Sequence, residues 1–279
     1  MITKRVIARL DIKNNALVKG VHLEGLRVLG DPASFAKIYY EEGIDEIIYM
    51  DVVASLYGRN SLIELVKKTS KEIFVPLTVG GGIRSIDDVG LLLSAGADKV
   101  CINTAAVKRP ELITEVVRMY GSSSLVIAVE AIKVKDDYIV FTNNGREQTD
   151  LKVSEWVKIV ENLGAGEILL TSVDREGTGK GIDINLFEKV RSCISISLVV
   201  HGGFGSISDV CGAFISHNID AACISSLFHY NTVLSIETSN KSLMGNKSFL
   251  YSNKKRSGID VVSVKNLKDE LKKRKVRVR

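Results

Sequence analysis

Four apolar segments of this sequence recur in the same order about 120 residues further on. The paired stretches are 6–11 with 125–130, 43–52 with 164–173, 80–81 with 202–203, and 97–103 with 219–225. A sustained offset of this kind indicates an internal repeat. Each half contains four strand-like runs separated by longer helical patterns. Eight such units in one chain predict a closed parallel (β/α)8 barrel, the TIM-barrel class, built from two half-barrel repeats.

The individual elements are predicted from apolar periodicity. Strands are expected at 5–11, 46–52, 74–79, 99–103, 125–130, 167–173, 197–201 and 221–226. Helices are expected at 32–42, 61–71 and 110–120 and around Trp156. Residues 133–149 predict a hairpin that turns at Asn144-Gly145. Residues 12–31 predict a long loop, of the kind that often forms a lid.

Length and composition fit a single barrel domain over 1–279, with 45% hydrophobic and 25% charged residues. No run of about 18 apolar residues occurs, so no membrane span is expected. The N-terminus lacks the pattern of a signal peptide. The cysteines show no C-x-x-C spacing, which favours reduced thiols in a cytoplasmic protein; they are Cys101, Cys193, Cys211 and Cys223. No metal or cofactor is expected.

The C-terminal segment is strongly basic. Residues 241–279 hold 13 Lys or Arg against 3 Asp or Glu, while the whole chain carries a net charge of +5. A basic tail can bind nucleic acid. Nucleic-acid platforms usually interleave aromatic residues with the charges, so a solvated helix face and a loop are the favoured interpretation.

Two glycine clusters follow equivalent strands in the two halves, Gly80-Gly81-Gly82 and Gly202-Gly203. Bare backbone N–H groups before a helix suit a phosphate. The alternative is a tight turn that needs positive φ. Asn103-Thr104 would lie beside the first cluster and Ser225-Ser226 beside the second. The sequence thus predicts two phosphate sites on opposite rims and an elongated bisphosphate substrate.

Carboxylates end the first strand of each half, Asp11 and Glu130. The C-terminal ends of barrel strands carry the active site in this fold. Because the two strands lie on opposite sides of the barrel, the carboxylates are expected to face each other across its mouth. Such a pair suits general acid and general base catalysis.

Several motifs together resemble the cyclase subunit family of imidazole glycerol phosphate synthase, HisF, of histidine biosynthesis. They are 5–11, Lys19-Gly20, 30–32, 79–83, 103–106, 164–171 and 174–178, and the stretch 264–279 resembles the final helix of that family. The resemblance implies a (β/α)8 barrel with a HisH-type glutaminase partner at its N-terminal pole. It also implies that ammonia passes through the barrel to a bisphosphorylated ribulosyl-formimino-aminoimidazole carboxamide ribonucleotide at the top. The products would be imidazole glycerol phosphate and aminoimidazole carboxamide ribonucleotide.

The resemblance also assigns roles to single residues. Asp11 matches a catalytic aspartate and Lys19 the lysine of the mobile first loop. One phosphate site matches Gly82, Asn103 and Thr104, and the other matches Gly177, Gly203 and Ser225. The gate for ammonia matches Arg5, Glu46, Lys99 and Glu167. Each gate residue begins an apolar strand, so the four could pair across the barrel floor or each could point to solvent.

Two features depart from the family pattern. Glu130 stands where the family has its second catalytic aspartate, and an extra methylene can shift a reacting group enough to slow catalysis. An Asn-, Ser- and Lys-rich insertion occupies 231–257, on the expected catalytic face. Both favour an alternative, an ammonia-delivery subunit for an amidotransferase that modifies a nucleotide sugar or surface glycan. The sister barrel that isomerises the aminoaldose of the pathway is a third reading, ranked last because it should lack the charged gate.

Overall fold

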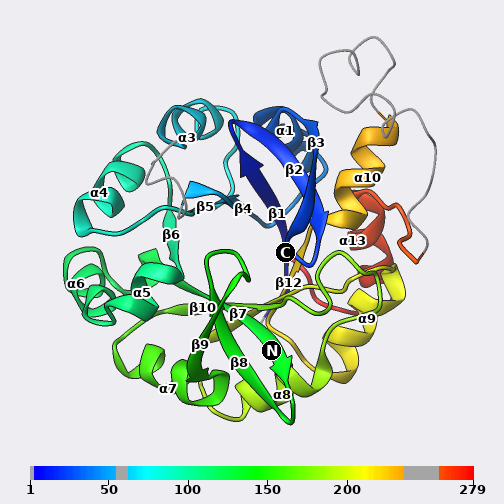
Figure 1. Cartoon of the computed structure of the whole chain (residues 1–279). Coiled ribbons are helices and arrows are strands. Elements are labelled where there is room, and N and C mark those ends of the chain that lie inside the picture. The colour runs from blue at the N-terminus through cyan, green and yellow to red at the C-terminus, as the bar shows by residue number, and fades with distance from the viewer. Residues whose placement is uncertain (1–2, 55–61, 236–257) are drawn as a thin grey trace.

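The computed structural model describes residues 3–54, 62–235 and 258–279. Eight parallel strands close into a barrel with helices around the outside, as Figure 1 shows. In chain order the strands are β1 (Arg5–Lys13), β4 (Glu46–Asp51), β5 (Leu77–Gly80), β6 (Lys99–Ile102), β7 (Leu125–Val134), β10 (Glu167–Ser172), β11 (Ser197–His201) and β12 (Ala221–Ile224). Pairing of β1 with β12 closes the ring. The predicted (β/α)8 barrel is therefore confirmed.

Helices cover the barrel, and the described ones are α1 (Pro32–Glu41), α3 (Ile63–Thr69), α4 (Ile86–Ser94), α5 (Thr104–Lys108), α6 (Glu111–Tyr120), α7 (Val153–Asn162), α8 (Ile184–Arg191), α9 (Ile207–Ser216), α10 (Ser226–Ser235) and α13 (Val264–Lys273). The expectation of a helix over 264–279 is wrong at its end. The chain leaves α13 after Lys273, and Val278 bridges to Lys4 beside β1. No helix in the described ranges is long and apolar enough to cross a membrane.

The two halves of the barrel share helix caps and side-chain hydrogen bonds at equivalent positions of the sequence repeat. Ser85 and Ser206 each begin a helix with a capping box, closed by Asp88 and Asp209. These boxes fix the turns that follow the two glycine clusters. Equivalent aspartates also accept a backbone N–H from a neighbouring strand: Asp98 from Leu77 at 2.8 Å and Asp220 from Leu198 at 3.2 Å.

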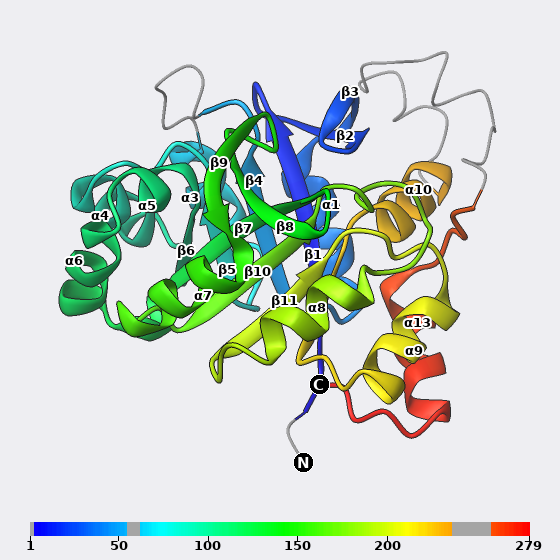
Figure 2. The same ribbon diagram turned by 60° about the horizontal axis from the view of Figure 1, so that its bottom comes forward.

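The predicted loop over 12–31 is an ordered hairpin instead. Strand β1 continues to Lys13 and pairs antiparallel with β2 (Ala16–Val21), which pairs with β3 (Glu24–Gly30). Leu17 and Val18 of β2 are both buried, in two different apolar clusters, and hold the hairpin on the barrel. Figure 2 shows it standing above the strand ends, opposite the C-terminus.

The predicted hairpin over 133–149 is confirmed and is larger than expected. Strands β7, β8 (Asp137–Thr142) and β9 (Glu147–Lys152) form an antiparallel extension. Its turn holds Asn143, Asn144 and Gly145 at positive φ, of 52°, 61° and 75°. Asn and Gly tolerate this conformation better than other residues.

Two of the three apolar clusters among the described residues form the core of the barrel. The larger lies between strands and helices. The smaller lies inside the barrel and consists of Ile7, Ile48, Cys101, Val126, Ala128, Leu169, Val199, Ala221 and Cys223. All four cysteines are free, and only Cys193 is not fully buried.

Candidate active site

Four charges from the starts of four strands form a closed ring at the barrel floor. Arg5 contacts Glu46 at 2.8 Å and Glu167 at 2.5 Å, and Lys99 contacts the same carboxylates at 3.3 and 3.1 Å. The four side chains thus pair with one another rather than pointing to solvent. Burial alone would raise the pKa of Glu167, but the positive charges of Arg5 and Lys99 outweigh it and hold that pKa below its usual value. Each charge is balanced, which is the condition for keeping such groups in the interior.

The two predicted carboxylates lie at the other end of the barrel. Asp11 on β1 and Glu130 on β7 are both buried. The Glu130 carboxylate accepts a hydrogen bond from the backbone N–H of Gly145 at 2.8 Å. Burial raises the pKa of Glu130 to about 7, against the lowering effects of the Arg9 charge and the Gly145 N–H. Glu130 can therefore gain or lose a proton near neutral pH.

Arg9 belongs to this cluster and was missed by the sequence analysis. Its Nε lies 2.8 Å from an Asp11 oxygen. The signal was present, because strand alternation places Arg5, Ile7, Arg9 and Asp11 on one face. Arg9 contributes to the family resemblance only as part of the segment 5–11, with no predicted role of its own.

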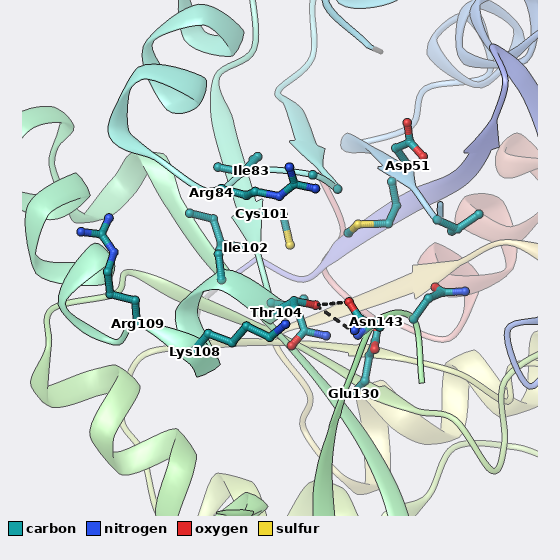
Figure 3. A pocket seen from close by; sticks show the side chains of 18 residues that line it. Asp51, Ile83, Arg84, Cys101, Ile102, Thr104, Lys108, Arg109, Glu130 and Asn143 are labelled. Carbon is teal, nitrogen blue, oxygen red and sulfur yellow. Dashed lines mark hydrogen bonds between the residues drawn. The ribbon is translucent and has the colours of Figure 1, made fainter. Parts of the chain in front are cut away.

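The first predicted phosphate site lines a cavity of about 430 Å³ at the mouth. Gly82, Asn103, Thr104 and Glu130 all line it. Three cations that the sequence analysis did not select, Arg84, Lys108 and Arg109, line it too, as Figure 3 shows. This charge suits a phosphorylated ligand. Thr104 shares hydrogen bonds with Asn143, whose backbone N–H donates to its hydroxyl at 3.1 Å.

The glycines beside this cavity also meet the demands of a tight turn. Gly81 has φ of 99°, and a Cβ there would lie 2.3 Å from the carbonyl oxygen of Asp51. Gly82 has φ of 73°. Both positions therefore favour glycine whether or not a ligand binds.

The residues of the second predicted phosphate site lie together, but the pocket that they line is small. Gly177, Gly203 and Ser225 line one pocket of only about 10 Å³, together with Glu176 and His201. The β2–β3 hairpin packs against its wall, and a Cβ on Gly177 would lie 2.7 Å from the carbonyl oxygen of Gly20. The backbone N–H of His22 donates to the carbonyl of Glu176 at 3.0 Å. A phosphate could enter here only if this wall moved.

Lys19 lies on β2, buried, in an ion pair with Glu176. The same carboxylate accepts the backbone N–H of Leu23 at 2.9 Å. Glu176 therefore ties the hairpin to the loop after β10. Glu176 belongs to the motif 174–178, but no sequence signal pairs it with Lys19, which is 157 residues away.

The predicted insertion at 231–257 is only partly described. Residues 231–235 form the end of α10, and 236–257 lie outside the described residues. The chain returns beside the loops that follow β10 and β11, where Asp260 donates its backbone N–H to the carbonyl of Gly205 at 2.7 Å. This contact is on the face that carries the two carboxylates.

Comparisons with known proteins agree on one family. The family model described as "Histidine biosynthesis protein" matches residues 5–234. An imidazole glycerol phosphate synthase subunit HisF from Legionella pneumophila is 54% identical over 210 residues, which are 75% of this chain and 99% of the relative. HisF subunits from Alkaliphilus metalliredigens and Bacillus cereus are 46% and 45% identical and cover 84% and 85% of this chain and 93% and 95% of their own length.

Proposed function

This chain belongs to the HisF family, as a cyclase subunit of imidazole glycerol phosphate synthase in histidine biosynthesis, and from that premise we propose how its residues act. It is a lyase-type enzyme of a glutamine amidotransferase complex. The proposal rests on what lies at the two ends of the barrel. A ring of paired charges lies at one end, and two buried carboxylates lie at the other.

The mouth is proposed to bind the bisphosphorylated ribulosyl-formimino-aminoimidazole carboxamide ribonucleotide. One phosphate would bind at Gly82, Asn103 and Thr104, where Arg84, Lys108 and Arg109 line the cavity. The other would bind at Gly177, Gly203 and Ser225 after the β2–β3 hairpin moves. Two separated anchors would hold the reacting centre between Asp11 and Glu130.

Asp11 and Glu130 are proposed to share the proton transfers that accompany cyclisation and cleavage. Ammonia must lose protons as it becomes a ring nitrogen, and the leaving group must gain one. The ion pair with Arg9 suits Asp11 to accept a proton. Glu130, with a pKa near 7, suits the donor role. The products are then imidazole glycerol phosphate and aminoimidazole carboxamide ribonucleotide.

Ammonia is proposed to enter through the four-charge ring formed by Arg5, Glu46, Lys99 and Glu167. Above the ring, the barrel interior is lined by apolar side chains, among them small ones such as Ala128, Ala221 and Cys223. Neutral ammonia can pass such a lining more readily than ammonium, which would have to lose its hydration. A HisH-type glutaminase would therefore dock at the N-terminal pole, where the strands begin.

Reconstitution tests this proposal. The purified chain alone should not hydrolyse glutamine. With a HisH-type glutaminase, glutamine and the bisphosphate substrate, it should release imidazole glycerol phosphate. Glutamine hydrolysis by the chain alone, or no product from the folded pair, would contradict the proposed division of labour.

One alternative keeps a specific observation in its favour. Glu130 stands in place of aspartate at the barrel mouth, and the chain that follows the insertion at 231–257 returns on the same face, at Asp260. They would suit a subunit that only delivers ammonia to an amidotransferase acting on a nucleotide sugar or glycan. That function predicts a chain with no turnover of the histidine-pathway substrate, which the closing experiment measures.

A further inference from the structure

Strands β1, β10 and β11 carry matching inward residues at three heights in the barrel. At the floor, Arg5 donates hydrogen bonds to Glu167 and Ser197. Two residues further on, Ile7, Leu169 and Val199 belong to the interior apolar cluster. Two residues beyond that, Arg9 lies 3.3 Å from both Thr171 and His201. The barrel therefore contains a second polar layer above the charged ring and directly below the mouth.

Arg9 is the centre of this upper layer. Only 1% of its surface is exposed. Its Nε donates to Asp11 at 2.8 Å, and its Nη1 to Thr171 and His201. Its Nη2 is buried without a hydrogen-bond partner among the described residues. A buried guanidinium is costly unless an opposite charge compensates it, and the direct counter-charge here is Asp11.

The groups facing Arg9 come from every side of the barrel. They are Asp11 on β1, Glu130 on β7, His201 on β11, Cys223 on β12 and Cys101 on β6. Burial and then the Arg9 charge hold the pKa of His201 well below its usual value, so its neutral ring accepts from the guanidinium. Burial raises the pKa of both thiols, which keeps them neutral. Asp11 is thus the one of these groups that Arg9 contacts in an ion pair.

We propose that Arg9 is a positioning residue of the cyclase reaction, which fixes the Asp11 carboxylate at the barrel mouth through a buried ion pair. The inference rests on the proposed role of Asp11. Without the guanidinium, the carboxylate would stand buried with no direct counter-charge. It would also lose the contact that sets its orientation, because Thr171 on β10 and His201 on β11 hold Arg9 in place.

The test compares wild type with Arg9→Lys and Arg9→Met in ammonium-driven turnover of the bisphosphate substrate, measured at one alkaline pH over a range of substrate concentrations. Arg9→Met should lower kcat by about a hundredfold with little change in KM, as expected for a misplaced catalytic group. Arg9→Lys should restore part of kcat, because it keeps a positive charge beside Asp11. Arg118→Met, on the exposed face of α6, is the matched control and should change neither kcat nor KM.

The outcomes that would overturn the role of Arg9 are distinct from those that would overturn the proposed function. An Arg9→Met protein with wild-type kcat would overturn the inference while leaving the proposed function intact. Equal losses of kcat in Arg9→Lys and Arg9→Met, or a loss that falls on KM instead of kcat, would also overturn it, because a positive charge at this position would then not position the carboxylate. If Arg9→Met does not fold, Arg9→Gln takes its place under the same criteria. A folded wild type without turnover would remove the proposed function first, and this inference with it.

Discussion

The carboxylate of Glu130 accepts a 2.8 Å hydrogen bond from the backbone N–H of Gly145, which lies in the turn between β8 and β9. The antiparallel extension of the barrel therefore reaches back to a residue at its mouth. An oriented N–H favours the charged carboxylate, while burial disfavours it, and burial has the larger effect. The result is a carboxyl group with a pKa of about 7.

This balance predicts that Glu130→Gln stabilises the protein at alkaline pH. A folded pKa raised from 4.5 to about 7 means that ionisation is easier in the unfolded chain. The destabilisation caused by ionising buried Glu130 is absent below pH 4.5 and grows as pH rises. It reaches about 3 kcal/mol above pH 7. Thermal melting at pH 8 should show a clear rise in the melting temperature of the variant, and melting at pH 4.5 a much smaller one.

The exposed glutamate Glu147 provides the control. Glu147→Gln should change the free energy of unfolding little at either pH. If Glu130→Gln melted at or below the wild-type temperature at pH 8, the claim that burial raises the pKa of Glu130 would be disproved. Ammonium-driven turnover by the same variant should fall by about 10² or more, because the group loses its exchangeable proton.

The charged ring at the floor should contribute to stability with the opposite sign. Glu167 has a folded pKa below its ordinary value, so its contribution is complete above pH 4.5 and is lost as pH falls through the folded pKa. Glu167→Gln should therefore cost about 3 kcal/mol at pH 7, because it leaves Lys99 and Arg5 undercompensated. Denaturant unfolding at several pH values measures this.

An exposed ion pair provides the control for the stability cost of breaking the buried ring. Arg109 and Glu115 are in contact at 2.9 Å, but both are well exposed. Glu115→Gln should cost less than about 1 kcal/mol. Equal costs for the two substitutions at pH 7 would mean that the ring is as weak as a surface pair.

Much of the barrel could be predicted because the repeat, the apolar runs and the strand-end polar residues are local signals. The family resemblance assigned the ring of Arg5, Glu46, Lys99 and Glu167, and four charges at four strand starts made pairing across the floor one of two expected arrangements. The β2–β3 hairpin was missed because glycines at 20, 25 and 30 suggested a loop, while the pairing of Leu17 and Val18 with the barrel is a tertiary effect. Contacts between residues far apart in the sequence, such as Lys19 with Glu176 and Arg9 with Thr171, carry no sequence signal of their own.

The contact between Lys19 and Glu176 predicts a specific opening of the hairpin. Glu176→Gln removes the charge that holds Lys19 and weakens the acceptor for the Leu23 N–H. Hydrogen exchange should then accelerate at the amides of β2 and β3 and remain unchanged in β10 and β11. Unchanged exchange in the hairpin would mean that other contacts hold it closed.

Crystals grown in phosphate should show two ions. One should lie near Gly82 and Asn103 in the existing cavity. The other should lie near Gly203 and Ser225 and be accompanied by displacement of the hairpin, because the present pocket is about 10 Å³. A displaced hairpin over an empty second site would count against a bisphosphate substrate.

Phe74 predicts a contact with the glutaminase. It precedes β5 on the pole where the strands begin and is 79% exposed. Exposed aromatic residues often anchor interfaces. Phe74→Ser should weaken partner binding by about tenfold or more in calorimetry, while ammonium-driven turnover stays at the wild-type rate. Leu91→Ser, on the outer face of α4 and 53% exposed, should bind normally; equal weakening by both would place the partner elsewhere.

Ammonium-driven turnover by the wild-type chain alone tests the central claim most directly. At high pH, free ammonia replaces the glutaminase, so the assay depends only on the mouth of the barrel. The account predicts measurable conversion of the bisphosphate substrate to imidazole glycerol phosphate and aminoimidazole carboxamide ribonucleotide, and its loss in Asp11→Asn. A folded wild-type protein that leaves the authentic substrate unchanged would contradict it and favour ammonia delivery to a sugar-modifying amidotransferase.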